Sequence, residues 1–238
     1  MCDIFEENKL RIASSETITY ALSKKDVDDG ISDVVRAMNQ VGLIVTCDIL
    51  DKYGNVRVSE DSGTRCPLVV CTTHLKAKKS EVGERYRLEE ARQLMQGINR
   101  TMKGLEACTQ PLLVLTGDLN AAPHSLTTGY EAHAYRAVKE HALGLRSLLN
   151  DDMGLPADDT WTTWKARLKK GKEKIAKNCI DYILYQPPRP GQGPGLQPTA
   201  LLELLREEDI GRDLLPNAGY PSDHVALAAD FAITTLRE

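Results

Sequence analysis

The feature that most limits the fold of this chain is the alternation of apolar, β-branched runs with amphipathic segments. Five runs have the length and composition of strands, and they cover residues 42–50, 67–75, 111–116, 179–185 and 225–233. Between the second and third runs, apolar residues recur every three or four positions over 81–102, which predicts a helix with one buried face. Strands and helices in this order predict one mixed-sheet domain of the α/β or α+β class, spanning residues 1–238.

Shorter elements are predicted between these. A turn at 52–55 indicates a hairpin whose returning strand is 56–58, and apolar spacing indicates helices over 130–149 and 200–208. The charged side of the 81–102 helix is predicted to face solvent. It consists of Glu84, Arg85, Arg87, Glu89, Glu90 and Arg92.

Two segments have the composition of loops. Residues 186–198 are dense in Pro and Gly, which predicts an exposed connection. Residues 165–177 form the most basic stretch of the chain, and a run of this kind is most simply a solvated loop.

Composition excludes several classes of protein. The 238 residues carry 30 basic and 34 acidic side chains, and this net charge of −4 argues against binding nucleic acid through bulk charge. No apolar run approaches the roughly 20 residues that a membrane-spanning helix needs. Six cysteines without a C-x-x-C pair indicate free thiols in a reducing compartment. We therefore expect a cytoplasmic protein, or a mitochondrial one where a longer form carries a presequence.

Side chains suited to catalysis follow or enter the predicted strands, where functional groups of such folds tend to lie. Each is weak alone, because turns favour Asp and Asn and a single histidine is usually structural. Asp181 is less ordinary, since a carboxylate within an apolar strand needs a partner. The candidates are His74, Asp118, Asn120, Asp181, Asp223 and His224.

Together these groups suit the hydrolysis of a phosphate ester. A histidine oriented by a buried carboxylate can act as a base near neutral pH. Asp118 and Asn120 offer carboxylate and amide groups two residues apart, on the same side of an extended segment. Hard oxygen donors with few histidines suit Mg²⁺, or Mn²⁺, better than zinc.

Several segments, in this order, resemble the motifs of the endonuclease/exonuclease/phosphatase superfamily and, within it, the carbon-catabolite-repressor-like deadenylase branch. They are Thr73-His74-Leu75-Lys76-Ala77, Glu84-Arg85-Tyr86-Arg87, Gly117-Asp118-Leu119-Asn120-Ala121, Thr162-Thr163-Trp164-Lys165, Ile180-Asp181-Tyr182-Ile183 and Tyr220-Pro221-Ser222-Asp223-His224. The resemblance runs through nearly the whole chain. It implies a four-layered α/β sandwich.

The resemblance also implies a role for each catalytic candidate. Asp118 and Asn120 correspond to the pair that binds the attacked phosphate and polarises its water. His74 corresponds to a histidine that faces the phosphate and stabilises the developing charge. His224 corresponds to the histidine that is paired with a carboxylate, here Asp181.

The segments at 162–165 and 220–224 imply a particular substrate. Members of the branch that carry such segments remove the 2′-phosphate from NADP and NADPH in a Mg²⁺-dependent reaction. Four residues, Lys76, Lys78, Lys165 and Arg167, fall at cationic positions of that pocket. Lys78 stands where an arginine is usual, so that a two-point contact with phosphate becomes a contact with a single charge.

One part of the family pattern is not found. Members carry a Gln-Glu motif whose Glu is the principal metal ligand, and no Gln-Glu dipeptide occurs in these 238 residues. Asp223 then remains as the residue that the resemblance places close to the metal. We expect an N-terminally incomplete member of the family, with weaker Mg²⁺ binding, little phosphatase activity and exposed apolar strand edges that lower its solubility.

Two alternatives stay open. The first is a 3′ exoribonuclease that shortens poly(A) RNA, although a chain with 5% aromatic residues provides few stacking platforms for bases. The second is a catalytically impaired fragment that acts as a binding module for a partner protein. The sequence does not indicate an oligomeric state.

Overall fold

The computed structural model of the chain describes most of its length, in separate stretches. These are residues 9–23, 35–58, 63–106, 110–123, 131–152, 154, 160–169, 172–190, 193–210 and 214–235. The following description concerns these residues only.

A six-stranded mixed sheet forms the centre of the protein, with strand order β1-β2-β3-β4-β8-β5. Only β3 and β4 pair in parallel among these strands, and the other pairs are antiparallel. The bounds are Leu10–Ser23 for β1, Val35–Ile49 for β2, Leu68–His74 for β3, Leu112–Asp118 for β4, Asp181–Tyr185 for β8 and Arg146–Ser147 for β5.

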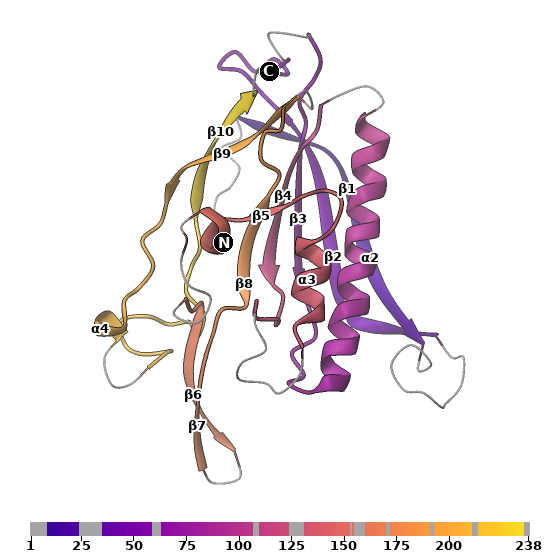
Figure 1. Cartoon of the computed structure of the whole chain (residues 1–238). Coiled ribbons are helices and arrows are strands. Elements are labelled where there is room, and N and C mark those ends of the chain that lie inside the picture. Colours follow the sequence, from indigo (N-terminus) through magenta and orange to yellow (C-terminus); the bar gives the residue numbers. More distant parts are fainter. Residues whose placement is uncertain are drawn as a thin grey trace.

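One face of this sheet is covered by helices (Figure 1). The 26-residue helix α2, Glu81–Glu106, lies beside the short helix α3, His133–Lys139. The apolar stripe of α2, represented by Leu94 and Ile98, packs against Ile44 of β2 and its neighbours, all of them buried. Burial of this stripe fixes the orientation of α2 relative to β3 and β4.

The opposite face of the sheet is covered by a second, two-stranded sheet. It consists of β9, Pro194–Leu201, and β10, Ala229–Thr235, in antiparallel register. Alternation along β8 connects the two layers, because Tyr182 and Leu184 face the helices while Ile183 and Tyr185 join the core beneath β9 and β10.

A hairpin and two short helical elements complete the described chain. The strands β6, Thr163–Lys169, and β7, Lys172–Asn178, form an antiparallel hairpin that extends away from the body of the protein (Figure 1). A π-helical turn follows β5 at Leu148–Asp152, and the short helix α4 spans Glu207–Ile210. No helix of the described part is long and apolar enough to cross a membrane.

The central elements agree with the sequence predictions. The runs predicted at 42–50, 67–75, 111–116 and 179–185 correspond to β2, β3, β4 and β8, and the helix predicted at 81–102 is α2. The strand β1 was not predicted, because polar residues interrupt its apolar ones and no apolar run stands out.

Peripheral elements differ more from prediction. The helix expected over 130–149 ends at Lys139, because Gly144 adopts φ of +60° in a turn before β5. The helix expected over 200–208 is wrong, since β9 continues to Leu201. The returning strand at 56–58 is reduced to isolated bridges, and the last strand begins only at Ala229.

Both predicted loops contain strands. The basic segment 165–177 forms most of the β6–β7 hairpin, in which Lys165 pairs with Ala176 and Arg167 with Lys174. The Pro- and Gly-rich segment 186–198 is a connection only until Pro194, where β9 begins. Backbone pairing along both strands of a hairpin therefore outweighs local charge and Pro content here.

The predicted solvent exposure of the charged side of α2 is wrong for three of its members. Glu84, Arg87 and Glu90 are buried, with 0 to 2% of each residue exposed. Their spacing of three residues places them on one side of the helix. They are buried because they bond to one another and to backbone atoms of the segment that follows β3.

Gly117, the residue before Asp118, offers a test of how tightly β3 and β4 are packed. Its φ is +144°, and a Cβ atom there would lie 2.1 Å from the carbonyl oxygen of Thr73. We expect Gly117→Ala to lower the free energy of unfolding by about 2–4 kcal/mol in urea denaturation. As a control, Gly104→Ala near the exposed end of α2 meets no atom within 4 Å and should raise it by about 0.5–1 kcal/mol. Equal effects of the two changes would contradict this account.

Candidate active site

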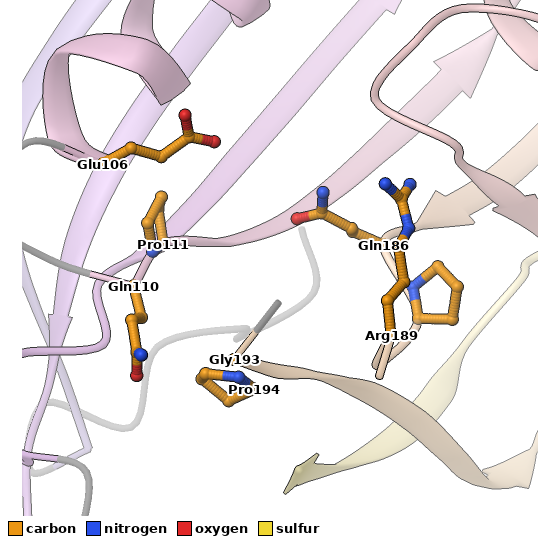
Figure 2. Close-up of a pocket in the computed structure, with 8 residues that line it drawn as sticks. Glu106, Gln110, Pro111, Gln186, Arg189, Gly193 and Pro194 are labelled. Carbon is orange, nitrogen blue, oxygen red and sulfur yellow. The ribbon is translucent and has the colours of Figure 1, made fainter. Parts of the chain in front are cut away.

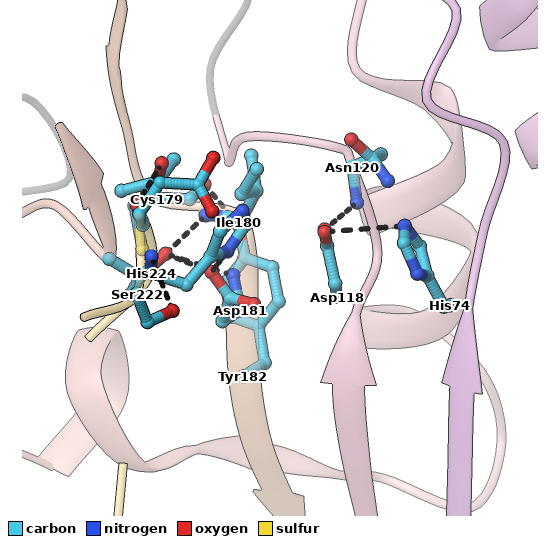
Figure 3. Close-up of polar contacts among 12 residues, drawn as sticks. His74, Asp118, Asn120, Cys179, Ile180, Asp181, Tyr182, Ser222 and His224 are labelled. Atoms are coloured by element: carbon cyan, nitrogen blue, oxygen red, sulfur yellow. Dashed lines mark hydrogen bonds and ion pairs between the residues drawn. The ribbon is translucent and has the colours of Figure 1, made fainter. Parts of the chain in front are cut away.

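Strand register brings three of the predicted residues to one edge of the sheet. His74 ends β3 and pairs with Asp118 at the end of β4, while Asp118 pairs with Asp181 at the start of β8. The Nε2 atom of His74 lies 3.5 Å from a carboxylate oxygen of Asp118 (Figure 3). His74 and Asp118 are 44 positions apart in the sequence, and Asp118 and Asp181 are 63 apart, so they are neighbours because of the pairing alone.

His224 joins this edge through Asp181 (Figure 3). Its Nδ1 lies 2.9 Å from Oδ2 of Asp181, and the same oxygen accepts a hydrogen bond of 2.6 Å from the Thr162 hydroxyl. The Thr162 oxygen in turn accepts the backbone N–H groups of Ile180 and Asp181. The carboxylate of Asp181 is therefore held in one orientation, and it orients the imidazole ring of His224.

The segment that begins β6 places His224 at this position. Thr163 forms a β-bridge with His224, and its hydroxyl donates to the carbonyl of Asp223 at 2.7 Å. The backbone N–H of Val225 donates to the carbonyl of Thr162. Two backbone links and one side-chain link thus fasten the segment around Asp223 and His224 to the start of the hairpin.

The buried Lys165 and the partly exposed Asp223 form an ion pair beside the histidine. The Lys165 Nζ donates to the Asp223 carboxylate and also lies 3.3 Å from Nε2 of His224. The Lys165 ammonium holds the pKa of Asp223 below its usual range. Only 8% of Lys165 is exposed, so its charge is directed into the site and away from bulk solvent.

Asn120 is positioned by a tight turn after β4. Its backbone has φ of +49°, its N–H donates to Oδ1 of Asp118 at 2.8 Å, and its side-chain amide donates to the carbonyl of Leu75 at 2.9 Å. Asn tolerates this left-handed conformation better than most residues. The turn therefore holds Asp118 and Asn120 together at the strand end.

Burial raises the pKa of the Asp118 carboxyl, and the nearby charge of Asp181 raises it further. The N–H of Asn120 and the imidazoles of His74 and His224 act in the opposite direction without cancelling these effects. The site thus disfavours the ionised form of Asp118, first because of burial and then because of the neighbouring carboxylate.

Asp118, Asp181 and His224 form the candidate metal-binding group. One ligand atom of each lies within 4.8 Å of the others. Two carboxylates at this separation fit a hard divalent cation such as Mg²⁺, and the raised pKa of Asp118 fits a site that a cation would neutralise. Asp223 is not part of this group, because its carboxylate pairs with Lys165; its predicted proximity to the metal stays a prediction.

The remaining predicted cations lie around the same edge. Lys76 and Lys78 follow His74, the first half-buried and the second exposed. Arg167 lies in β6, two positions beyond Lys165, and its side chain is outside the described part of the structure. The roles of these residues in binding substrate stay predictions.

Sequence reasoning assigned no role to Thr162, although it is fully buried and supports the Asp181 carboxylate. A signal was present, since Thr162 opens the Thr162-Thr163-Trp164-Lys165 motif and directly precedes β6. It could not reveal that Thr162 reaches Asp181, because that contact joins strands from two different sheets.

Two cavities of about 370 Å³ each differ in their relation to this site. One adjoins His74 and is lined also by Asn39, Gln40, Val41, Leu43, Thr72 and Thr73. The other lies beyond the opposite end of β4 and β8, where Figure 2 shows it between the segments before β4 and before β9. Its lining residues are Glu106, Gln110, Pro111, Gln186, Pro187, Arg189, Gly193 and Pro194. Only the first is placed to receive part of a substrate.

Comparison with curated proteins finds several nocturnins that are similar to this chain. Rat nocturnin is 33% identical over 166 residues, which cover 68% of this chain and 33% of the relative. Human nocturnin is also 33% identical, over 168 residues, with 69% and 33% covered. Nocturnin of Drosophila melanogaster is 32% identical over 180 residues, with 69% and 25% covered. The chain thus spans about a third or less of the length of these relatives. No protein-family model matches it.

Solved structures show the same fold. The catalytic domain of human nocturnin with a bound sulfate anion has a TM-score of 0.60 at 23% identity, covering 97% of this chain and 62% of that one. ANGEL2, a 2′,3′-cyclic phosphatase, has a TM-score of 0.61 at 20% identity, with 95% and 68% covered. The predicted fold class is confirmed.

The fold is that of the metal-dependent phosphoesterases of the endonuclease/exonuclease/phosphatase superfamily, and the Asp–Asp–His group is its candidate site here. Within that superfamily the chain is a homologue of nocturnin. The resemblance drawn from the sequence motifs is confirmed at both levels.

The raised pKa of Asp118 has a consequence for stability. A carboxyl whose pKa is raised on folding stabilises the fold fully at pH values below its unfolded pKa, and this contribution is lost as the pH rises through the folded pKa. We therefore expect Asp118→Asn, without added metal, to raise the melting temperature by a few degrees at neutral pH and to lose this advantage in acid. Calorimetry at both pH values measures this, with Asp230→Asn on the exposed side of β10 as control. An equal advantage at both pH values would contradict it.

Proposed function

We propose that the chain carries the catalytic site of a Mg²⁺-dependent phosphohydrolase that removes the 2′-phosphate of NADP and NADPH. The observation that supports this most strongly is the oriented His224–Asp181 pair beside Asp118, with the Lys165 ammonium next to Nε2 of His224. Homology to nocturnin supports the reaction class, and the motifs at 162–165 and 220–224 support the choice of nucleotide.

The histidine pair can hold a proton at a defined atom. When Nδ1–H donates to the Asp181 carboxylate, Nε2 carries the lone pair and can accept a proton from water or from a neighbouring donor. The Lys165 ammonium lies 3.3 Å from that atom. It adds positive charge where a phosphoryl oxygen would approach, which stabilises the charge that develops during hydrolysis.

The other residues bind and orient. Asp118 and Asp181 would hold the divalent cation, and when bound it polarises a phosphoryl oxygen as a Lewis acid. Asn120 can donate its amide to the phosphate or to the attacking water. His74, whose side chain is 69% exposed, lies between this group and the cavity that would receive the rest of the nucleotide.

The β6–β7 hairpin favours a second candidate, a 3′ exoribonuclease acting on poly(A) RNA. Its register pairs Arg167 with Lys174 and Lys169 with Lys172, so that cationic positions continue from Lys165 along the hairpin. A series of cations that begins at a phosphate site suits a polyanion. The low aromatic content still favours the small nucleotide.

Phosphate release from NADPH, measured beside shortening of a poly(A) oligonucleotide at saturating Mg²⁺, separates the two candidates. We expect slow NADPH turnover without RNA shortening, slow because the Gln-Glu metal ligand of the family is not found in these residues. His224→Ala or Asp118→Ala should lower kcat at least about a hundredfold further. His133→Ala on the exposed side of α3 should behave as wild type. RNA shortening alone would overturn the proposal, and activity unaffected by both site substitutions would indicate a contaminating enzyme.

A further inference from the structure

Three charged residues of α2 are buried directly behind the segment that carries the predicted phosphate-binding lysines. Arg87 donates from Nε and Nη2 to the Glu84 carboxylate, at 2.9 and 2.7 Å. Its third nitrogen, Nη1, donates to the carbonyl oxygens of Lys76 and Lys78, both at 2.8 Å. A fully buried guanidinium is thus used to hold two carbonyl groups of one short segment.

Glu90 holds the same segment from the other side of its backbone. Its Oε2 accepts the N–H of Lys76 at 2.8 Å, while its Oε1 is buried without a hydrogen-bond partner among the described residues. Glu84 uses its second oxygen to accept the N–H of Ala134 at the start of α3. The three side chains therefore tie the segment after β3 to both helices.

The segment also packs closely on the start of α2. A Cβ atom at Gly83 would lie 1.9 Å from the carbonyl oxygen of Lys78, so only glycine allows this approach. On its other side, Leu75 donates its N–H to the carbonyl of Asp118 and accepts from the Asn120 amide. A continuous chain of hydrogen bonds thus runs from α2 through Lys76 to the catalytic strand end.

We propose that Glu84, Arg87 and Glu90 form a clamp that positions the backbone of Lys76–Lys78 for phosphate binding, and that Glu90 is a positioning residue for the substrate. The inference rests on the proposed function for the identity of the ligand. Lysine side chains lose conformational entropy when they bind phosphate. A backbone that is already fixed reduces the total entropy lost on binding. None of the three clamp residues needs to contact the substrate.

The electrostatics of Glu90 are consistent with such a role. Burial raises the pKa of its carboxyl to about 7, against the opposing effects of the Lys76 N–H and of the charges of Lys76 and Arg87; the Tyr20 phenol of β1 also faces it. An ionised carboxylate with an unpartnered oxygen destabilises the fold at neutral pH. Stability of α2 therefore does not account for Glu90, whereas the need for an oxygen acceptor at the Lys76 N–H does.

Two substitutions separate positioning from general stability. Glu90→Gln keeps an oxygen acceptor for the Lys76 N–H, and Glu90→Ala removes it. We expect Glu90→Ala to accelerate amide hydrogen exchange at Lys76 and to weaken NADPH binding about tenfold, measured by calorimetry without Mg²⁺ so that no turnover occurs. Glu90→Gln should match wild type in both within about threefold. Glu81→Ala, an exposed carboxylate of the same helix, serves as the control.

A melting experiment checks that Glu90→Gln folds. The stabilisation that protonated Glu90 gives is lost as the pH rises through about 7, so the Gln variant should melt above wild type well above that pH and level with it well below.

The outcomes are distinct. If Glu90→Ala exchanges or binds as wild type does, or if Glu90→Gln is as weak as Glu90→Ala, the clamp is wrong. If wild type fails to bind NADPH, the proposed function fails. The clamp is then judged by amide exchange at Lys76 and by affinity for inorganic phosphate. Weaker binding of phosphate by Glu90→Ala than by wild type and Glu90→Gln supports the clamp, and equal affinities overturn it.

Discussion

The pairing of β4 with β8 sets two carboxylates opposite each other, and the rest of the candidate site is arranged around them. Asp118 and Asp181 are register partners at a strand end, and a shift of one residue would turn one of them to the other face of the sheet. The parallel pairing of β3 with β4 then places His74 beside Asp118. The geometry of the acidic group is therefore a property of the sheet, supported by the apolar residues that bury β4 and β8 on both faces.

A second set of contacts positions His224, which lies outside the central sheet. Thr162 bonds to the Asp181 carboxylate, and the bridge between Thr163 and His224 draws the segment before β10 towards the same edge. The histidine is thus positioned by its carboxylate and by its backbone together. This explains why the start of the hairpin is buried and well packed, while the part of β7 around Lys174 and Ile175 is exposed.

The sequence predicted what depends on strands and their ends, and it was less informative about what depends on packing between layers. Apolar runs locate β3, β4 and β8, so His74, Asp118 and Asp181 could be found as polar residues at their boundaries. Glu84, Arg87 and Glu90 could not be recognised as buried, because the apolar stripe of α2 makes every charged residue outside it look solvated. Their burial follows from hydrogen bonds to a loop whose course only the fold reveals. No pattern of residue types encodes it.

Buried carboxyls with raised pKa values occur at two places, one in the candidate site and one behind it. Asp118 lies near the Asp181 carboxylate and Glu90 lies behind the lysine segment, and burial raises the pKa of both carboxyls. Two carboxylates held close together repel each other and destabilise the fold until a cation neutralises them. Relief of this repulsion therefore contributes to the free energy of cation binding. The clamp differs in this respect, because Arg87 and the Lys76 N–H already compensate its charge in part. Under the proposed function, the two carboxylates of the candidate metal site and the clamp are thus separate groups, joined through the backbone of Leu75 and Lys76. Substitution of a clamp residue can then alter the lysine segment while the pairing of Asp118 with Asp181 keeps its geometry.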